Sequence, residues 1–386
     1  MKELIKDHIR KILEIGCQIK KYDNLIIFLP EESKEIENIL LELRFEYKIN
    51  KIIFVKNNYK EIYNFLKNNP TEEEIIKYIK KYPKINKNFK SINFYCEDYS
   101  GYYYKLNYEI YRIYSKYLTI EYKFNKEMYN VLKNIPKTIT PCPTYEWTNN
   151  LFKSNLKKDE LWNLITKTVP SREQIQEEII KLKRIKDNLN KLAIKELYFC
   201  TKQGTDLRLS LSKNSTWITG INSINNIEYF PNFPSYEIFT APDRNKVEGK
   251  VIINKSSSLY GIRIDNAELQ FHQGKLISCD SNSEKWNKIV MNNANGLNRI
   301  GEISLVSNDT PISKLNYDFK SQLLDENTEC HLALGCAYRK CTKVPEIILN
   351  KIGMNHYNFN DSLFHQDLVF GDDSVIVEAK TKHKTL

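Results

Sequence analysis

Hydrophobic and polar positions follow different rhythms in the two halves of the chain. In the first half, the apolar runs NLIIFLP (24–30), KIIFV (51–55) and SINFYC (91–96) are separated by segments whose apolar residues recur at helical spacing. One of these helical segments opens with Thr71 and Glu74, which have the spacing of a capping box. Strands that alternate with helices predict a mostly parallel sheet covered by helices.

Two helical segments of the first half have distinctive apolar faces. The opening residues MKELIKDHIRKILEIG predict a core helix whose apolar face comprises Leu4, Ile5, Ile9, Ile12 and Leu13. They lack the uncharged core of a signal peptide, so we expect a cytoplasmic protein. The tyrosine-rich stretch at 100–122 has aromatic residues near helical spacing. This spacing favours a core or dimer-facing helix over an aromatic ligand platform.

The second half is patterned as short alternating strands. Examples are LRLSL (207–211), KVIIN (250–254) and AELQFH (267–272), the last followed by a Gln273-Gly274 turn. This pattern predicts an antiparallel sheet. A long amphipathic helix, capped by Ser171 and Gln174, precedes these strands.

The fold class expected from these patterns is α/β. An N-terminal α/β/α domain with a mostly parallel sheet, residues 1–190, would end in the long bridging helix. A C-terminal α+β domain rich in antiparallel strands, residues 191–386, would follow and carry the catalytic site. The first domain contains neither a GxGxxG nor a Walker loop, so candidate chemistry is sought in the second.

Composition and charge exclude several classes of protein. The net charge is +10, but the excess is lysine spread along the chain, with ten arginines and no basic block, so we expect no nucleic-acid partner. No apolar run approaches the roughly 20 residues that span a bilayer, so we expect no membrane partner. The eight cysteines form no CxxC pair or zinc-finger spacing and are predicted to be reduced, mostly buried thiols.

Carboxylates and imidazoles occur in unusual settings in the second half. His365 and Asp367 lie two residues apart on a predicted strand and so face the same side. Glu237 and Glu302 are flanked by apolar residues, and burying a carboxylate is costly unless it is paired or binds a cation. With His331, in DENTECHLALGC, they could form a two-metal centre of oxygen and nitrogen ligands. They could equally be separate polar residues at sheet edges, with His331 a structural histidine.

Six sequence blocks resemble the aminopeptidase T and aminopeptidase S family of thermophilic-type metalloproteases, and their order and spacing match as well. The resemblance runs from about residue 137 to 371, whereas the first 130 residues resemble that family only as a generic α/β domain. The blocks are GTDL (204–207), NFPSYEIFTAP (232–242), VEGKV (247–251), GEISLV (301–306), SQLLDENTECHLALGCAY (321–338) and HQDLVFG (365–371).

The resemblance implies a set of site residues and a cofactor. It assigns Glu237, Glu302, His331, His365 and Asp367 as metal ligands, with one carboxylate bridging two divalent ions of Zn, Co or Mn, Mg being possible. Glu326 is implied as a further ligand or as the catalytic base, a role that Glu302 could also take, and Tyr338 as the active-site tyrosine. The same resemblance implies a homodimer.

The implied activity is release of the N-terminal residue from peptides that have a free N-terminus. Two departures from the family pattern lie outside the ligand set: Asp243 stands where the family usually has histidine, and the chain ends in DDSVIVEAKTKHKTL. They put substrate preference in doubt more than the chemistry. The alternatives are a mononuclear iron ring-cleaving dioxygenase of related fold and an inactive peptide-binding homologue.

Overall fold

A computed structural model of the 386-residue chain describes all residues except 97–107, 154, 260–261, 293–295, 373 and 382–386. The chain forms two compact units, one of Met1–Arg172 with Ile221–Ser235 and one of Glu173–Gly220 with Tyr236–Leu386. The predicted domain boundary at residue 190 stays a prediction.

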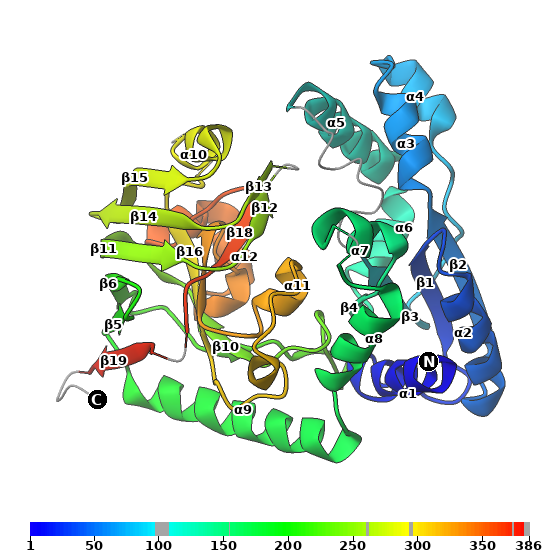
Figure 1. The fold of residues 1–386 in the computed structure, drawn as a ribbon, viewed down its shortest axis with the longest axis horizontal. Helices are drawn as coiled ribbons and strands as arrows, with labels where there is room; N and C mark the ends of the chain where they lie inside the picture. The colour runs from blue at the N-terminus through cyan, green and yellow to red at the C-terminus, as the bar shows by residue number, and fades with distance from the viewer. Residues whose placement is uncertain (97–107, 154, 260–261, 293–295, 373, 382–386) are drawn as a thin grey trace. The chain divides into compact units, whose positions relative to one another are not determined.

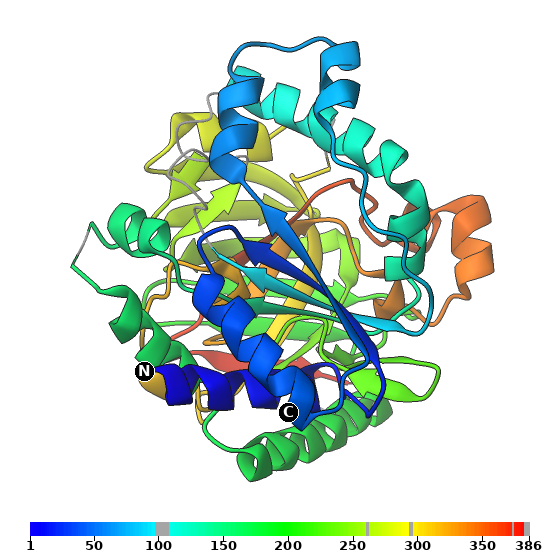
Figure 2. The ribbon, with the colours of Figure 1, turned by 90° about the vertical axis from the view of Figure 1, so that its right-hand side faces the viewer.

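A four-stranded parallel sheet forms the centre of the first unit, in the order β2-β1-β3-β4. Figure 2 shows helix α2 lying across one face of it. The predicted alternation of strands and helices and the capping box at Thr71 and Glu74 are both confirmed. The strands are β1 (Asn24–Pro30), β2 (Lys51–Asn57), β3 (Phe89–Tyr95) and β4 (Lys137–Pro141), with a small pair β8 (Asn222–Ile224) and β9 (Ile227–Tyr229). The helices are α1 (Lys2–Lys11), α2 (Lys34–Glu46), α3 (Tyr59–Leu66), α4 (Glu72–Tyr78), α5 (Tyr108–Phe124), α6 (Lys126–Leu132), α7 (Tyr145–Leu151) and α8 (Lys158–Lys167).

The opening helix is a core helix, as predicted, apart from one residue. Ile5 and Ile9 are fully buried, and so are Ile12 and Leu13 in the single π-helical turn that follows α1. Leu4, predicted on the same face, is instead 39 % exposed. Successive helical residues are turned by about 100°, so Leu4 lies at the edge of the stripe that Ile5 and Ile9 form.

The tyrosine-rich stretch is helical in its described part. Helix α5 begins at Tyr108, and Tyr114 and Tyr117 are buried against Leu66 and Ile75. These contacts confirm the core interpretation for this part of the stretch. The part of the prediction that falls on residues 100–107 lies outside the described residues.

The buried His8 in α1 has no polar partner. It is 1 % exposed, its ring lies 6.2 Å from that of Trp162 and 6.5 Å from that of Phe233, and neither ring nitrogen has a hydrogen-bond partner among the described residues. Burial, assisted by the charge of Lys11, lowers the pKa of His8 to about 3. The folded protein therefore keeps this imidazole neutral.

We predict that His8 lowers the stability of the folded protein in acid. Because its pKa is lower in the folded than in the unfolded chain, the free energy of unfolding should be unaffected by His8 above about pH 6.5. It should then fall by about 1.4 kcal/mol per pH unit as the pH drops from 6.5 toward 3. Urea unfolding at pH 7.5 and 5 should show a smaller acid loss for His8→Leu than for the unsubstituted protein. A change at the exposed His356 (His356→Gln) should leave the loss unaltered, and an equal loss in all three proteins would contradict the prediction.

The second unit is built on two sheets, and the pairing of their strands is antiparallel, as predicted. The six-stranded sheet has the order β15-β14-β11-β6-β5-β19, and the five-stranded sheet has the order β18-β17-β16-β10-β7. Apolar side chains from both sheets, such as Val251 and Leu332, belong to one core cluster. At the predicted Gln273-Gly274 turn both residues have positive φ, as a tight hairpin requires.

The strands of the second unit are grouped here by sheet. The larger sheet contains β5 (Glu196–Cys200), β6 (Asp206–Leu211), β11 (Pro242–Ile253), β14 (Ala267–His272), β15 (Lys275–Ser281) and β19 (Ile376–Lys380). The five-stranded sheet contains β7 (Ile218–Thr219), β10 (Glu237–Thr240), β16 (Ile300–Val306), β17 (His331–Gly335) and β18 (His365–Val369), and β12 (Ser257–Leu259) pairs with β13 (Ile262–Ile264). The helices are α9 (Arg172–Leu192), whose first residue lies in the first unit, α10 (Glu284–Val290), α11 (Gln322–Asp325) and α12 (Glu346–Ile352) (Figure 1).

The described residues also bear on the predictions about membrane spans and cysteines. None of the described helices combines the length and the apolar character needed to cross a bilayer. Five of the eight cysteines are buried, which confirms that part of the cysteine prediction. Their predicted reduced state stays a prediction.

Candidate metal centre

Strand register brings the predicted ligands to one face of the five-stranded sheet. Ser304 of β16 pairs with His331 of β17, and Ala333 lies between Glu302 on one neighbouring strand and Asp367 on the other. Side chains alternate along a strand, so Glu302, His331 and Asp367 point to the same side. The small side chain of Ala333 leaves room between the two acids. A bulge between Ile300 and Glu302 interrupts the pairing just before the glutamate.

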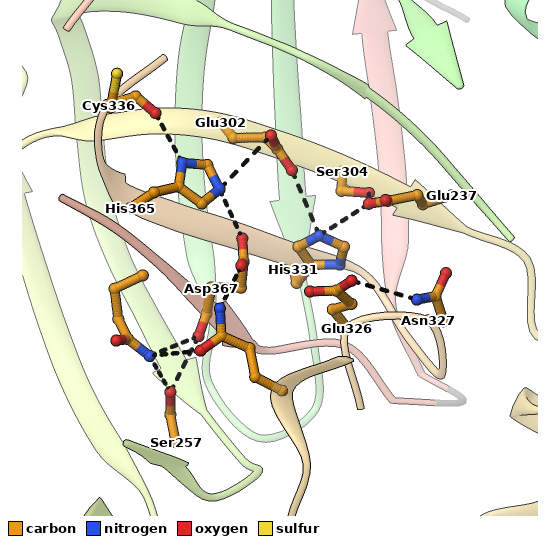
Figure 3. Close-up of polar contacts among 12 residues, drawn as sticks. Glu237, Ser257, Glu302, Ser304, Glu326, Asn327, His331, Cys336, His365 and Asp367 are labelled. Atoms are coloured by element: carbon orange, nitrogen blue, oxygen red, sulfur yellow. Dashed lines mark hydrogen bonds and ion pairs between the residues drawn. The ribbon is translucent and has the colours of Figure 1, made fainter. Parts of the chain in front are cut away.

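The side chains form two overlapping groups that share Glu302 (Figure 3). In the first group, Nε2 of His331 lies 3.2 Å from Oε2 of Glu237 and 3.5 Å from Oε1 of Glu302. In the second, Nε2 of His365 lies 3.1 Å from Oδ1 of Asp367 and 3.9 Å from Oε2 of Glu302. The potential ligand atoms of each group all lie within 4.8 Å of one another. Five of the six predicted ligands are therefore brought together.

Buried negative charge dominates the cluster. Burial raises the pKa of Glu302 to about 7, although hydrogen bonding to His331 acts in the opposite direction. Burial alone would lower the pKa of each histidine, but the neighbouring carboxylates outweigh it. They raise the pKa of His331 well above its ordinary value and that of His365 to about 10. The cluster thus strongly favours bound positive charge, whether as protons or as a cation.

A divalent cation fits this cluster. Glu302 is 3 % exposed, and its Oε2 accepts no hydrogen bond from the described residues. A buried carboxylate oxygen without a donor, among other carboxylates, is strongly destabilised unless a cation neutralises it. The potential ligands are oxygens and imidazole nitrogens, a set that suits Zn, Co or Mn, whereas burial raises the pKa of the neighbouring Cys330 and Cys341 thiols and keeps them protonated.

Outer contacts orient the candidate ligands, and the sequence reasoning missed them. Nδ1 of His365 lies 2.8 Å from the carbonyl oxygen of Cys336, which turns Nε2 toward the carboxylates. Gln322 donates from Nε2 to Oδ2 of Asp367 at 2.6 Å, and the Ser304 hydroxyl donates to Oε2 of Glu237 at 3.2 Å. Gln322 lies within one of the matched sequence blocks, but no local pattern distinguishes it from a surface glutamine.

Glu326 lies beside the two groups but belongs to neither of them. It directly follows α11 and is buried, and its pKa is raised well above the ordinary value by burial and by the charges of Asp367 and Glu237. Figure 3 shows its carboxylate next to His331. Its predicted role as a ligand or base stays a prediction.

Tyr338 stands at the edge of the cluster. Its ring centroid is 4.6 Å from that of His365 and 5.8 Å from that of Phe239, and the residue is 48 % exposed. Its hydroxyl makes no hydrogen bond to any described residue. Desolvation and the nearby charges of Asp367 and Glu302 raise its pKa, so the phenol keeps its proton.

Asp243, the departure from the family pattern, belongs to neither ligand group. Its Oδ1 accepts from the backbone N–H of Asn245 at 3.0 Å and its Oδ2 from Nδ2 of Asn358 at 3.3 Å. These hydrogen bonds give Asp243 a local structural role.

Known proteins are similar in sequence to part of this chain. Aminopeptidase PepS of Streptococcus thermophilus is 30 % identical over 257 residues, which cover 62 % of this chain and 60 % of that protein. Aminopeptidase 2 of Geobacillus stearothermophilus is 31 % identical over 257 residues, 64 % of this chain and 61 % of that protein. The matched segments thus span about three fifths of these relatives.

Two solved structures have a similar fold. Wild-type AmpT from Thermus thermophilus superimposes with a TM-score of 0.82 at 20 % identity, covering 100 % of this chain and 97 % of that one. The 2,5-dihydroxypyridine dioxygenase from Pseudomonas putida superimposes with a TM-score of 0.50 at 9 % identity, covering 100 % and 94 %. At these identities the likeness concerns the fold alone.

The family expected from the sequence blocks is confirmed over nearly the whole chain. The model of the thermophilic metalloprotease (M29) family matches residues 1–385. The match includes the first 130 residues, where the sequence blocks gave only a generic resemblance. This chain belongs to the thermophilic metalloprotease (M29) family.

Proposed function

We propose that this protein is a metal-dependent aminopeptidase that removes the N-terminal residue from peptides. The observation that carries the proposal is the pair of histidine and carboxylate groups joined at Glu302, whose buried Oε2 accepts no hydrogen bond from the described part of the chain. Family membership supports the same reaction class.

In this proposal two divalent ions, Zn, Co or Mn with Mg also possible, are bound per chain. Glu237 and His331 would hold one ion and His365 and Asp367 the other, with Glu302 common to both groups. Ions bound there would polarise the scissile carbonyl and lower the pKa of a bound water from 15.7 toward about 7. Gln322 and the carbonyl of Cys336 hold Asp367 and His365 in position.

Glu326 is the general base we favour. It lies outside both ligand groups, whereas both oxygens of Glu302 face histidines of the cluster. A carboxylate not engaged as a ligand can take a proton from the attacking water and return it to the leaving amine. Glu326 would hold that proton between the two steps.

Substrates in this proposal are peptides with a free N-terminal amine, which an acidic side chain or an ion of the cluster would hold. Blocking the amine leaves its buried partner unsatisfied and should prevent cleavage. We expect stepwise release of single residues from free peptides and at least about 100-fold slower cleavage of the same peptides after N-acetylation. Mass spectrometry of timed digests checks this, and internal cleavage of the acetylated peptides would indicate an endopeptidase instead.

Tyr338 is proposed as the donor to the oxyanion of the tetrahedral intermediate. Tyr338→Phe keeps the ring beside His365 but removes the hydroxyl. We predict a loss of about 10² to 10³ in kcat, with KM and metal content nearly unchanged, because the hydroxyl acts on charge that appears in the transition state. Steady-state kinetics with metal analysis checks this. A variant with normal kcat would show that Tyr338 serves only for packing. A variant that lost metal would show that Tyr338 supports the metal centre and does not take part in the reaction.

A ring-cleaving dioxygenase with one iron is the second candidate. The dioxygenase superposition favours it only at the level of the fold. An inactive peptide-binding homologue is a third reading, and it predicts neither turnover nor bound metal. Elemental analysis of the purified protein separates them: two ions of Zn, Co or Mn per chain support the peptidase, and one iron supports the dioxygenase.

Homodimeric assembly, which rests on the family resemblance, and a cytoplasmic location complete the proposal. Light scattering of the purified protein and cell fractionation test them. We propose no nucleic-acid or membrane partner.

A further inference from the structure

A cationic cavity lies in the second unit, at the end of the five-stranded sheet where β16 and β18 begin and β17 ends. It has a volume of about 770 Å³ and is lined by Arg244, Lys275 and Arg299, with Asp361 as the one acidic residue among the described lining residues. None of the candidate metal ligands lines it. The cavity is therefore distinct from the metal centre.

Arg244 is the unusual residue of this cavity. It is half-buried, and its guanidinium has neither a hydrogen bond nor an ion pair with any described residue. Elsewhere in the chain, Arg10 and Arg172 are bonded to carboxylates. Burial lowers the pKa of Arg244, and the charge of Asp361 acts in the opposite direction, but the hydrogen bond that the Asp361 carboxylate accepts comes from the backbone N–H of Met354, at 3.3 Å from Oδ2. Arg244 thus presents an unpaired planar set of donors to the cavity.

The backbone of Arg244 is held while its side chain is not. Its N–H donates to the carbonyl of Asn358 at 2.8 Å, and its own carbonyl accepts from Nη1 of Arg299. Arg299 is 9 % exposed and also donates to Oδ1 of Asn245 at 3.2 Å. This arrangement places two like charges next to each other, and burial together with the charge of Arg244 lowers the pKa of Arg299. Even with Asp361 included, positive side chains outnumber negative ones among the described lining residues, which favours an anion as ligand.

We infer that this cavity binds the oxyanion group of a small molecule, a carboxylate or a phosphate, with Arg244 as its main ligand and Arg299 and Lys275 as further positive charges. A guanidinium is suited to such groups because its fork of N–H donors matches two oxygens. The volume exceeds that of an inorganic ion, and Leu363 and Phe364 give the cavity an apolar side, so an organic anion fits. This inference does not depend on the proposed peptidase activity.

Calorimetric titration of the full-length protein with inorganic phosphate and, separately, with succinate tests the inference. One of the two should bind saturably with one site per chain, and the stronger binder identifies the oxyanion as phosphate or carboxylate. Arg244→Gln should weaken that binding about tenfold or more. Arg184→Gln is the matched control, because it makes the same charge change on α9 outside the cavity and should leave the affinity within about twofold.

Thermal unfolding separates ligand binding from a structural role of Arg244. Without added anion, Arg244→Gln should melt at the same temperature as the unsubstituted protein or higher, because an unpaired, half-buried charge is removed. The binding anion should raise the melting temperature of the unsubstituted protein but not of the variant. Lys275→Gln at an exposed position should fold normally and weaken binding by about two- to fivefold. Absence of saturable binding by either anion, equal weakening by Arg184→Gln, or a lowered melting temperature of anion-free Arg244→Gln would overturn the inference.

Discussion

Exhaustive chelation should abolish hydrolysis of aminoacyl arylamides, to less than about a thousandth of the starting rate, and added Zn²⁺, Co²⁺ or Mn²⁺ should restore it. The reason lies in the cluster itself. Its carboxylates and imidazoles can bind cations and move protons, but none of them can produce hydroxide from water at neutral pH unaided. Loss of the ions should also leave Glu237, Glu302 and Asp367 to repel one another, so the chelated protein should unfold at a lower temperature.

The measurement pairs the arylamidase rate with elemental analysis before chelation, after chelation and after each metal is added. Activity should return in proportion to bound metal and reach its maximum at two ions per chain. A chelated protein that contains no metal but retains its rate would eliminate the proposed chemistry. Full activity at one ion per chain would reduce the two-metal proposal to a single ion.

Glu302→Gln should have the largest effect of any single substitution at the site. Glu302 is common to both groups, and an amide has no charge and only one oxygen with which to replace the carboxylate. We expect loss of both ions and a fall of about 10³ or more in kcat/KM. Glu237→Gln alters only the first group and should mainly weaken the ion bound with His331.

Asp243→Asn is the matched control for this series. Asp243 is a buried acid of the same unit, it belongs to neither group, and the change is again from carboxylate to amide. Its metal content should equal that of the unsubstituted protein. Equal metal loss from the Glu302 and Asp243 variants would show that the site has been assigned to the wrong residues, and two ions retained by Glu302→Gln would show that Glu302 is not shared.

Local sequence pattern predicted the elements well because they depend on neighbouring residues. The predicted strand that contains His365 and Asp367 is β18, with both residues on one face, and the apolar residues that flank Glu302 belong to β16. Local pattern alone could not decide whether His331 is a ligand or a structural histidine. That choice required either the family blocks or the strand pairing that brings His331 next to Ser304.

The remaining features depend on long-range geometry and could not be predicted. Glu302 on β16 and Asp367 on β18 lie on either side of Ala333 on β17. This arrangement of three strands allows Glu302 to belong to both ligand groups. Gln322 reaches Asp367 across 45 positions in the chain, which no periodicity indicates. Leu4 lies at the edge of the apolar stripe of α1, and the sequence alone does not show how far the neighbouring elements cover that edge.

The order of the ligands along the chain also has a consequence for biosynthesis. The first group requires residues 237, 302 and 331, and the second requires 302, 365 and 367, so the groups are completed in that order as the chain is synthesised. A nascent chain that has emerged only as far as β17 carries one complete group, and the second ion has no complete group until β18 emerges and pairs with β17. In the proposed enzyme, the second ion could therefore be bound only after Asp367 has emerged, so a shorter nascent chain would lack a complete two-ion centre.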